Sequence, residues 1–495
     1  MKRSSGVLLP LSALPGKYGI GGLGKCAYDF IDFLDSAGQA YWQMLPIGHT
    51  DMGNSPYSSI STFAGNPNYI DIDALLLEGL LEEETFRGLC FGAQEDRVDY
   101  GLVSSSHETL LRKAYENSCG AYNSRVEAFS GENPWLRGYA LYMALKRRFN
   151  ETAWYEWPEE IKRRRQDSVD FWERELENEI GYWKFTQYLF HTQWQKLRSY
   201  ALERGIKLIG DIPIYVAGDS ADVWLEPWFF ELDGQCRPKN VAGVPPDYFS
   251  ETGQLWGNPL YDWDKMRADG WGFWIRRVDG AAKLFDVVRI DHFRAFSTYW
   301  SVPADAETAC KGRWRQGPGM ELVGMLQNWF AGTEFIAEDL GILTPDVREL
   351  LAESGLPGMK ILEFAFTPGA NSDYLPHNFE RNCVAYAGTH DNNTILGWLE
   401  EASGEERDFA AKYIGAGEKE SFVWAMLRCG MESVANLFVC QMQDILEKPG
   451  NCRTNTPGLA RGNWQWRLRE GECSPQLAKK LAEYTKMTGR YNYYK

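Results

Sequence analysis

The feature that most limits the possible folds of this chain is a repeated alternation of short apolar runs with longer amphipathic segments. The short runs are rich in β-branched and aromatic residues, and helical patterns follow them, as expected for β–α units around a parallel sheet. Eight runs are candidate strands: Val7–Leu9, Tyr41–Leu45, Leu208–Ile212, Val287–Ile290, Phe335–Ala337, Met359–Leu362, Val384–Tyr386 and Leu437–Cys440. This pattern predicts an α/β fold, a (β/α)8 TIM barrel.

Three of the intervening helices have recognisable ends, where capping residues, first-turn prolines and acids, or terminal glycines occur. They are Lys25–Ser36 with Gly38 after it, a helix opened by Thr344-Pro345-Asp346 and closed near Gly355, and a helix from Trp183 to Gly205. These helices separate candidate strands, as the barrel requires.

The spacing of the strands is uneven, although no low-complexity linker or repeat divides the 495 residues. We therefore expect one catalytic barrel over residues 1–495 without a separate C-terminal β-sandwich domain. Two stretches are predicted insertions on it. The first, about 69–182, is charged and mainly helical, and the second, about 217–274, is rich in loops.

Charge and cysteine usage exclude several classes of partner. The formal net charge is −16, and the longest basic run, Lys162–Arg165, is flanked by acids, so no nucleic-acid or membrane partner is expected. The apolar residues after Lys2 and Arg3 are interrupted by Pro10 and are too few for a signal peptide. The 10 cysteines include no C-x-x-C pair, which favours reduced thiols in the cytoplasm.

Acidic residues follow four of the candidate strands, and in a TIM barrel the C-terminal strand ends surround the active site. These residues are Asp211, Asp291, Glu338 and Asp391. Arg289 and Asp291 are two residues apart and share one side of a strand, so the arginine should keep the aspartate ionised as a nucleophile. Glu338 follows an apolar run, where burial would raise its pKa and retain a proton for general acid catalysis.

Two carboxyl groups with opposite protonation states, about 5–5.5 Å apart, are what retaining glycoside cleavage needs. A third, Asp391, would bind sugar hydroxyls and favour the transition state. Each acid alone is also compatible with a helix cap, a turn or an internal ion pair. Four such endings in one barrel favour the catalytic interpretation over these structural ones.

Ordered sequence blocks along nearly the whole chain resemble one family, the amylomaltases or disproportionating enzymes of glycoside hydrolase family 77. The blocks include Ser5–Leu9, Ser55–Ser59, Gly210–Val216, Leu255–Trp263, Arg289–Phe293, Ala337–Gly341, Thr389–Asn392 and Gly462–Arg467. The family is related to the α-amylases. The resemblance implies a retaining 4-α-glucanotransferase that moves α-1,4-glucan segments to the 4-OH of another glucan or of glucose, through a covalent glycosyl-aspartate.

The resemblance also implies roles for individual residues. Asp291 would be the nucleophile, Glu338 the acid/base and Asp391 the transition-state stabiliser. The residues implied in sugar binding are Tyr57, Asp211, Arg289 and His390, with Trp256 on a loop covering the glucan and Asn463 near the substrate. Prolines within Val244–Phe249 and the nearby Gly253 and Gly257 suit a lid that would exclude water and favour a sugar acceptor.

Several positions depart from the family pattern without involving the three implied catalytic acids. They are Pro10-Leu11, Met52, Thr367-Pro368 and Arg453-Thr454-Asn455, of which Met52 puts a secondary glucan site in doubt.

Two other functions remain open at this point: a retaining α-glucan hydrolase of the amylase type, and a glucan-binding scaffold without catalysis. No metal or cofactor is expected, since the six histidines are dispersed and Gly19–Gly22 lacks a dinucleotide-binding spacing. The expected partners are α-1,4-glucans and maltooligosaccharides, with glucose as an acceptor.

Overall fold

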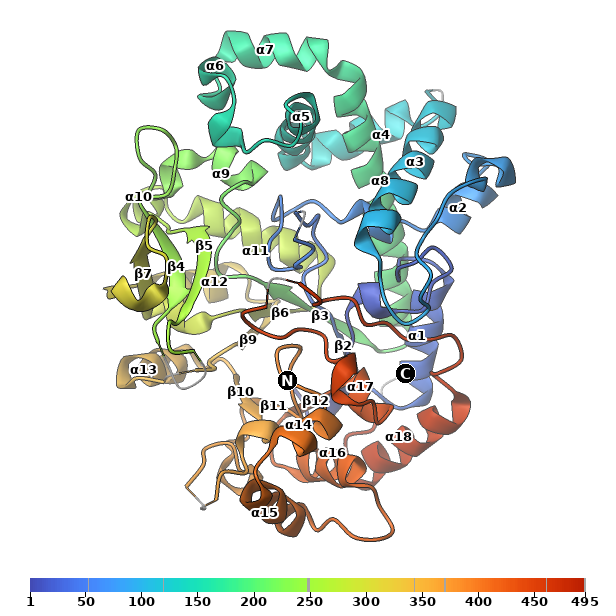
Figure 1. Cartoon of the computed structure of the whole chain (residues 1–495), viewed down its shortest axis with the longest axis vertical. Coiled ribbons are helices and arrows are strands. Elements are labelled where there is room, and N and C mark those ends of the chain that lie inside the picture. Colours follow the sequence, from blue (N-terminus) through green and yellow to red (C-terminus); the bar gives the residue numbers. More distant parts are fainter. Residues whose placement is uncertain are drawn as a thin grey trace.

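A ring of parallel strands lies at the centre of the molecule, with helices around it (Figure 1). The computed structural model describes residues 1–51, 53–118, 120–246, 250–341, 343–368, 371–459 and 461–493. Within these ranges the ring has eight strands: β1 (Ser4–Leu8), β2 (Tyr41–Gln43), β3 (Lys207–Ile212), β6 (Val287–Ile290), β9 (Glu334–Ala337), β10 (Gly358–Ile361), β11 (Cys383–Tyr386) and β12 (Leu437–Gln441). They correspond to the eight predicted strands with small shifts at their ends, and the predicted barrel is confirmed.

The strands lie around the ring in chain order. Continuous parallel pairing runs from β10 through β11, β12, β1, β2, β3 and β6 to β9. The remaining gap, between β9 and β10, is bridged where the Ala337 amide donates to the Pro357 carbonyl at 3.0 Å. All strands therefore end on one side of a nearly closed barrel.

Alternate residues of each strand point into the barrel, because side chains in a strand have a period of two. An inner apolar cluster contains one or two residues from each strand, among them Ile209, Val287, Ile336, Val384 and Val439. Their neighbours Leu208, Val288 and Phe335 belong to the larger cluster between the strands and the helices. Asp211, Arg289 and Glu338 are in step with the inner residues, so this alternation directs them inward at the barrel mouth.

Helices of different lengths surround the barrel on its outer side (Figure 1). They are α1 (Lys25–Ser36), α8 (Glu177–Glu203), α11 (Gly272–Leu284), α12 (Met320–Trp329), α13 (Pro345–Ser354), α14 (Ile395–Glu401), α15 (Gly404–Ile414), α16 (Phe422–Glu432), α17 (Met442–Ile445) and α18 (Pro475–Met487). Helices α1 and α13 have the predicted ends, although the Thr344 side chain makes no capping hydrogen bond.

Helix α8 differs from its prediction because it begins at Glu177 rather than at Trp183. Its first turn contains Glu177 and Glu179, acids that the positive end of the helix dipole stabilises. The apolar periodicity used to find the start of the helix does not extend into this polar turn, so the predicted start was wrong.

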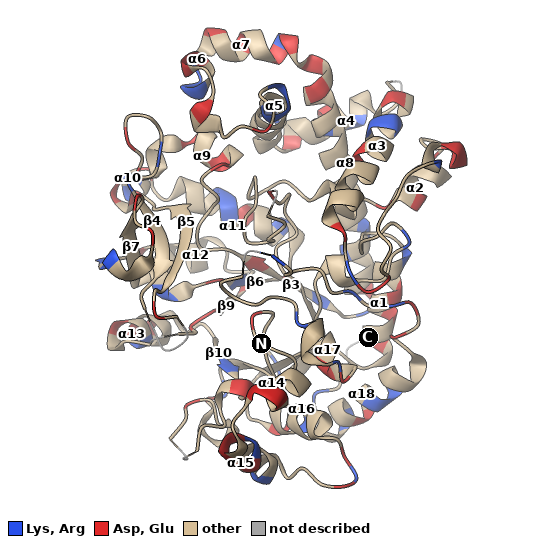
Figure 2. Cartoon of the chain, viewed as in Figure 1, with Lys and Arg blue, Asp and Glu red and all other residues tan. Residues whose placement is uncertain are grey.

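The chain between β2 and β3 forms a helical region that lies above the barrel in Figure 1. Before α8 it contains α2 (Ile72–Leu77), α3 (Tyr100–Ser118), α4 (Asn123–Glu132), α5 (Trp135–Arg148), α6 (Glu159–Lys162) and α7 (Gln166–Glu175). The basic run here is paired with acids, for example Lys162 with Glu159 at 2.6 Å. Acidic and basic residues are likewise mixed on outer helices such as α15 and α18 (Figure 2). In the part of the chain that the structure describes, no helix is both long and apolar enough to cross a membrane.

A second sheet, which the sequence patterns did not predict, lies beside the barrel mouth (Figure 1). Among the described residues it has four antiparallel strands in the order β5-β4-β7-β8: β4 (Asn240–Val244), β5 (Gln254–Pro259), β7 (Thr298–Pro303) and β8 (Arg313–Gln316). The first two strands precede α10 (Trp263–Ala268) and the other two follow β6. The sheet therefore joins segments that follow two different barrel strands, a long-range pairing that local sequence does not show.

The fully buried Arg490 side chain lies at the other end of the barrel, near the start of strands β1 and β12. The Arg490 guanidinium donates to the carbonyls of Ser4 at 2.7 Å, Met431 at 2.6 Å and Ala435 at 3.0 Å. Further bonds reach the carbonyls of Ser433 and Asn436. Burial lowers its pKa to about 9. These bonds connect the start of β1, the end of α16 and the segment before β12.

We expect Arg490→Met to destabilise the fold by about 3 kcal/mol or more, because buried carbonyls left without donors cost roughly 1–3 kcal/mol each. Thermal unfolding followed by circular dichroism measures the change. Arg174→Met, at an exposed position on α7, is the matched control and should leave the transition within about 1 °C. Equal midpoints of thermal unfolding for the two variants would show that the hydrogen bonds of Arg490 do not stabilise the fold.

Candidate active site

The two acids that the sequence assigned to catalysis leave neighbouring barrel strands at the same level. Ile290 of β6 and Ala337 of β9 are register partners, and Asp291 and Glu338 are the residues that follow them. The Glu338 amide donates to the Ile290 carbonyl at 3.0 Å. Adjacent strands lie about 4.8 Å apart. Asp291 and Glu338 therefore lie side by side at the barrel mouth, as a pair acting on one bond requires.

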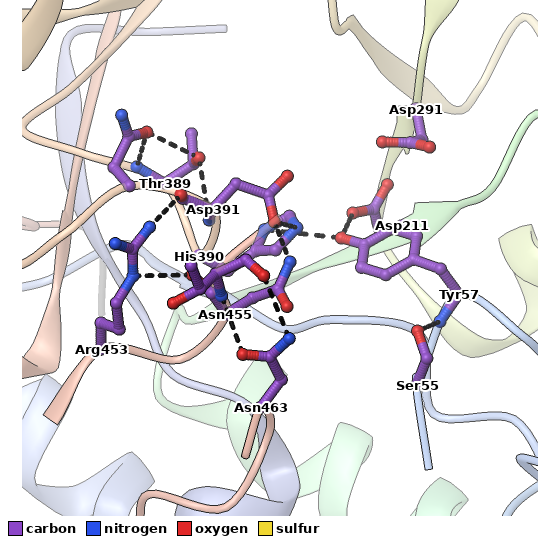
Figure 3. Close-up of polar contacts among 12 residues, drawn as sticks. Ser55, Tyr57, Asp211, Asp291, Thr389, His390, Asp391, Arg453, Asn455 and Asn463 are labelled. Atoms are coloured by element: carbon purple, nitrogen blue, oxygen red, sulfur yellow. Dashed lines mark hydrogen bonds and ion pairs between the residues drawn. The ribbon is translucent and has the colours of Figure 1, made fainter. Parts of the chain in front are cut away.

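Arg289 is the centre of an ion-pair network beneath Asp291. Its Nη1 lies 2.6 Å from Asp211 Oδ2 and 3.1 Å from Asp291 Oδ1. The Tyr57 hydroxyl donates to the same Asp211 oxygen at 2.7 Å. In Figure 3 Tyr57, Asp211 and Asp291 lie together on one side of the site. Arg289 and Asp211 are buried, so these charges compensate one another and hold the side chains in fixed positions.

Glu338 is held by two backbone amides. The amide of His292 donates to Oε2 at 2.6 Å and that of Leu340 donates to Oε1 at 2.9 Å. The His292 amide points to Glu338 because the backbone of His292 has a left-handed conformation, with φ 49°. This conformation is uncommon for a residue other than glycine. The carboxyl group is buried, and burial raises its pKa to about 7 although Arg289 and the two amides oppose the rise.

Burial also raises the pKa of the Asp291 carboxyl well above its ordinary value. The Arg289 guanidinium lowers it, but the nearby carboxylates of Asp211, Glu338 and Asp391 add to the rise. The net direction is opposite to the one expected from the Arg-x-Asp pair alone, because that expectation ignored burial and the other acids. The Glu338 carboxylate therefore opposes ionisation of Asp291, and the two neighbouring acids do not lose their protons independently.

Asp391 lies across the barrel mouth from this pair, in the loop after β11. Its Oδ1 accepts a hydrogen bond from Asn455 Nδ2 at 2.6 Å and lies 3.4 Å from His390 Nε2. Arg453 donates to its backbone carbonyl at 2.8 Å. Figure 3 shows these residues opposite Asp291. The loop is thus held by a segment more than sixty residues further along the chain.

Tyr57 connects the two halves of the site. Its ring stacks on the His390 ring, with centroids 5.0 Å apart and an interplanar angle of 19°. Burial lowers the pKa of His390 and raises that of Tyr57, so both side chains are neutral near pH 7. A continuous chain of contacts therefore runs from Asp391 through His390 and Tyr57 to Asp211.

Trp256 and Asn463, the two other predicted substrate residues, have different surroundings. Trp256 is in strand β5 rather than in a loop, and its ring centroid lies 4.9 Å from that of His292. The Asn463 side chain bonds to the backbone of Thr456 and Leu459, which orders its own loop. Of the predicted lid, residues 247–249 lie outside the described part of the chain.

Four residues that contact the predicted site residues were not assigned a role from the sequence: His292, Arg453, Asn455 and Trp464. His292 and Trp464 lie within the family-like blocks Arg289–Phe293 and Gly462–Arg467, which is the signal that could have identified them. Arg453 and Asn455 were recognised only within a departure from the family pattern, and the left-handed backbone conformation of His292 has no signal in the sequence. The Trp464 ring lies 6.0 Å from both the Tyr57 and the His390 rings, a contact that follows only from tertiary folding.

This arrangement is suited to acid–base and nucleophilic chemistry on a neutral polar substrate. It offers a coupled acid pair, a third carboxylate opposite them, and neutral hydrogen-bonding and aromatic side chains between. Among the described residues, no group of three or more histidine, cysteine or acidic side chains has a geometry suited to a metal ion.

Comparison with known proteins gives one consistent result. A family model described as 4-alpha-glucanotransferase matches residues 9–473. A 4-alpha-glucanotransferase of Clostridium butyricum is 45% identical over 97% of this chain and 99% of its own length. That of Thermus thermophilus is also 45% identical, over 99% of both chains.

Solved structures agree with these sequence matches. The amylomaltase of Streptococcus agalactiae in complex with acarbose is 40% identical, with a TM-score of 0.97 over 99% of this chain and 100% of that one. The amylomaltase of Corynebacterium glutamicum, 18% identical and with a TM-score of 0.77, shares the fold over 99% of this chain and 75% of its own.

Proposed function

The chain belongs to the 4-alpha-glucanotransferases of glycoside hydrolase family 77, and on that premise we propose that it transfers α-1,4-glucan segments by a retaining, two-step mechanism. The observation that most supports this mechanism is the placement of Asp291 and Glu338 after a register pair of adjacent strands. Such neighbouring carboxyl groups suit a covalent intermediate, whereas inverting enzymes separate their acids by about 6.5–9.5 Å to admit a water.

In the first step the Asp291 carboxylate attacks the anomeric carbon, forming a C–O bond to the enzyme. The bond from that carbon to the departing glucan breaks, and the Glu338 proton moves to the leaving oxygen. Arg289 contacts Asp291 directly and opposes the effect of burial on it, and in the proposed mechanism this contact keeps the charge on Asp291 and the proton on Glu338. Departure of the leaving segment then leaves a glycosyl-aspartate beside a Glu338 carboxylate.

In the second step the 4-OH of another glucan, or of glucose, gives its proton to Glu338 while its oxygen attacks the anomeric carbon. Asp291 is released as a carboxylate, and Glu338 is again protonated. The two inversions restore the α configuration. Asp391, opposite the pair and held by Asn455 and Arg453, would stabilise the positive charge that develops on the sugar ring.

The remaining predicted residues would bind the sugar at the cleavage point. Tyr57, with its ring stacked on His390, offers an apolar surface, while Asp211 and Arg289 offer charged hydrogen-bonding groups. Trp256 beside His292 would cover the sugar next to the nucleophile and limit access by water. The described contacts of Asn463, with the backbones of Thr456 and Leu459, support a role in holding these two residues near the site.

The substrates we propose are α-1,4-glucans and maltooligosaccharides, with glucose as an acceptor. A cytoplasmic location is also proposed, supported by nine cysteines among the described residues that are all free thiols.

Incubation with maltotriose tests whether a sugar or water accepts the intermediate. We expect glucose and longer maltodextrins with little new reducing end, and ¹³C-labelled glucose added as an acceptor should appear at the reducing ends of products. A steady rise in reducing ends, without labelled oligosaccharides, would instead identify a hydrolase of the amylase type. Binding of glucan without any product would support the non-catalytic scaffold.

A further inference from the structure

The ring of barrel strands has a seam beside the proposed general acid. The continuous pairing of the described strands stops between β9 and β10. Across this seam the Ala337 amide donates to the Pro357 carbonyl at 3.0 Å. Nearer the barrel mouth the contact is made by a side chain, because the Met359 amide donates to Asp339 Oδ1 at 2.6 Å. The residue after Glu338 therefore connects the end of β9 to β10 through its carboxyl group.

The Asp339 carboxyl group packs closely against the start of β10. The residue is buried, with 4% of its surface exposed. Gly358 leaves room for it, because a Cβ at this position would lie 2.8–2.9 Å from the carboxyl carbon and both carboxyl oxygens of Asp339. The backbone of Gly358 is not in the left-handed region, so this close approach explains the glycine. Shape and hydrogen bonding thus both fix the Asp339 side chain at the seam.

The segment from Glu338 to Leu340 is anchored on both of its sides. On the β6 side, the Glu338 amide donates to the Ile290 carbonyl at 3.0 Å, and the Glu338 carbonyl accepts from the Phe293 amide at 2.9 Å. On the β10 side, the anchor is the Asp339 side chain. The Leu340 amide belongs to the peptide unit that begins at Asp339, and it donates to Glu338 Oε1 at 2.9 Å. Asp339 therefore holds the peptide unit that orients the Glu338 carboxyl group.

We propose that Asp339 is a positioning residue for the acid/base Glu338. The inference rests on the proposed function, because it takes Glu338 to be the group that transfers the proton. A general acid must lie within hydrogen-bond distance of the oxygen that it protonates, and a displacement of about 1 Å can lower a rate by about 100-fold. The Asp339 carboxyl group bonds to β10 at the seam, so it acts through Glu338 rather than on the sugar.

Two reactions that differ in their need for Glu338 test the proposal. Transfer between maltotriose molecules needs the Glu338 proton in the first step and the Glu338 carboxylate in the second. With α-maltotriosyl fluoride as the donor and azide as the acceptor, fluoride leaves as an anion and azide attacks without losing a proton. We expect Asp339→Ala to lower kcat for maltotriose by about 10- to 100-fold. KM for maltotriose and the rate of α-maltotriosyl azide formation should each change by less than about 2-fold.

Two further variants test the same contact, one from each strand. Asp339→Asn retains an oxygen that can accept from the Met359 amide, so it should recover most of the lost kcat. Gly358→Ala adds a Cβ that displaces the Asp339 carboxyl group, so it should show the same selective loss as Asp339→Ala. Asp408→Ala, at an exposed position on α15, is the matched control and should leave both reactions unaffected. Thermal unfolding is recorded for each variant, and the assays are run well below every midpoint.

Equal losses in the two reactions by a folded Asp339→Ala variant would overturn the proposal, because Asp339 would then support the barrel as a whole. Unaltered rates in both reactions would also overturn it. Glu338→Gln in the same assays separates this inference from the proposed function. A selective loss in Glu338→Gln without one in Asp339→Ala would refute only the positioning role. Loss of both reactions, or of neither, in Glu338→Gln would refute the acid/base assignment itself.

Discussion

Asp291→Asn lowers the rate of transfer between maltotriose molecules by about 10⁴-fold or more, because an amide cannot form the glycosyl-enzyme bond. The effect is expected to be in kcat, since the substitution keeps the shape of the side chain and leaves Tyr57 and Asp211 in place. Product formation followed by chromatography measures the rate, and amylose retardation in native gels shows that glucan binding remains.

Asp264→Asn is the matched control for this substitution. Asp264 lies on α10 with 93% of its side chain exposed, and the same change there should leave kcat unaltered. An Asp291→Asn variant with unaltered turnover would contradict the nucleophile assignment. Lost binding together with lost turnover would point to a structural role for Asp291 within the Arg289 network.

Glu338→Gln lowers kcat on maltotriose by about 10²- to 10⁴-fold, the range that a positioned general acid contributes. The glucan leaving group then departs without a proton. α-Maltotriosyl fluoride restores the first step in this variant, because fluoride needs no protonation, and added azide accepts the glycosyl group without a base. Neither reagent rescues Asp291→Asn, so the two roles are separable in one experiment. Glu353→Gln, exposed on α13, is the control.

Glu338→Gln should also change how kcat/KM depends on pH. Burial raises the pKa of Glu338 from 4.5 to about 7, so the acid form that donates the proton is present below pH 7 and is lost as the pH rises through that value. For the unaltered enzyme, kcat/KM should therefore decline above about pH 7. Glu338→Gln removes this decline, and an unchanged decline would assign it to another group.

Much of the barrel was predictable from local sequence because its strands are short apolar runs between amphipathic helices. Each of the eight predicted runs is a barrel strand, and α1 has the predicted ends. The local apolar pattern did not predict the start of α8, because the first turn of this helix is polar. The pattern failed again for the antiparallel sheet, whose strands pair across segments that follow β3 and β6.

The carboxyl groups of the candidate site were predictable because strand ends converge on one side of a parallel barrel. The pKa shifts of these carboxyl groups were predictable only in part. Burial of Glu338 followed from the apolar run before it, and its pKa shifts in the expected direction. The expected direction of the Asp291 pKa shift was wrong, because the arginine two residues away was weighed without the burial of the carboxyl group and the nearby acids, which raise its pKa.

By itself, the sequence determined the order of the strands, the acids at their ends and the family to which the chain belongs, since these depend on residues that are neighbours in the chain. Tertiary structure decided which distant residues complete the site. Asn455 and Arg453 hold Asp391, the left-handed His292 turns its amide to Glu338, and the Trp464 ring lies near those of Tyr57 and His390. Contacts of this kind depend on how separate segments pack and on which charges are buried together, and neither is encoded in any one stretch of sequence.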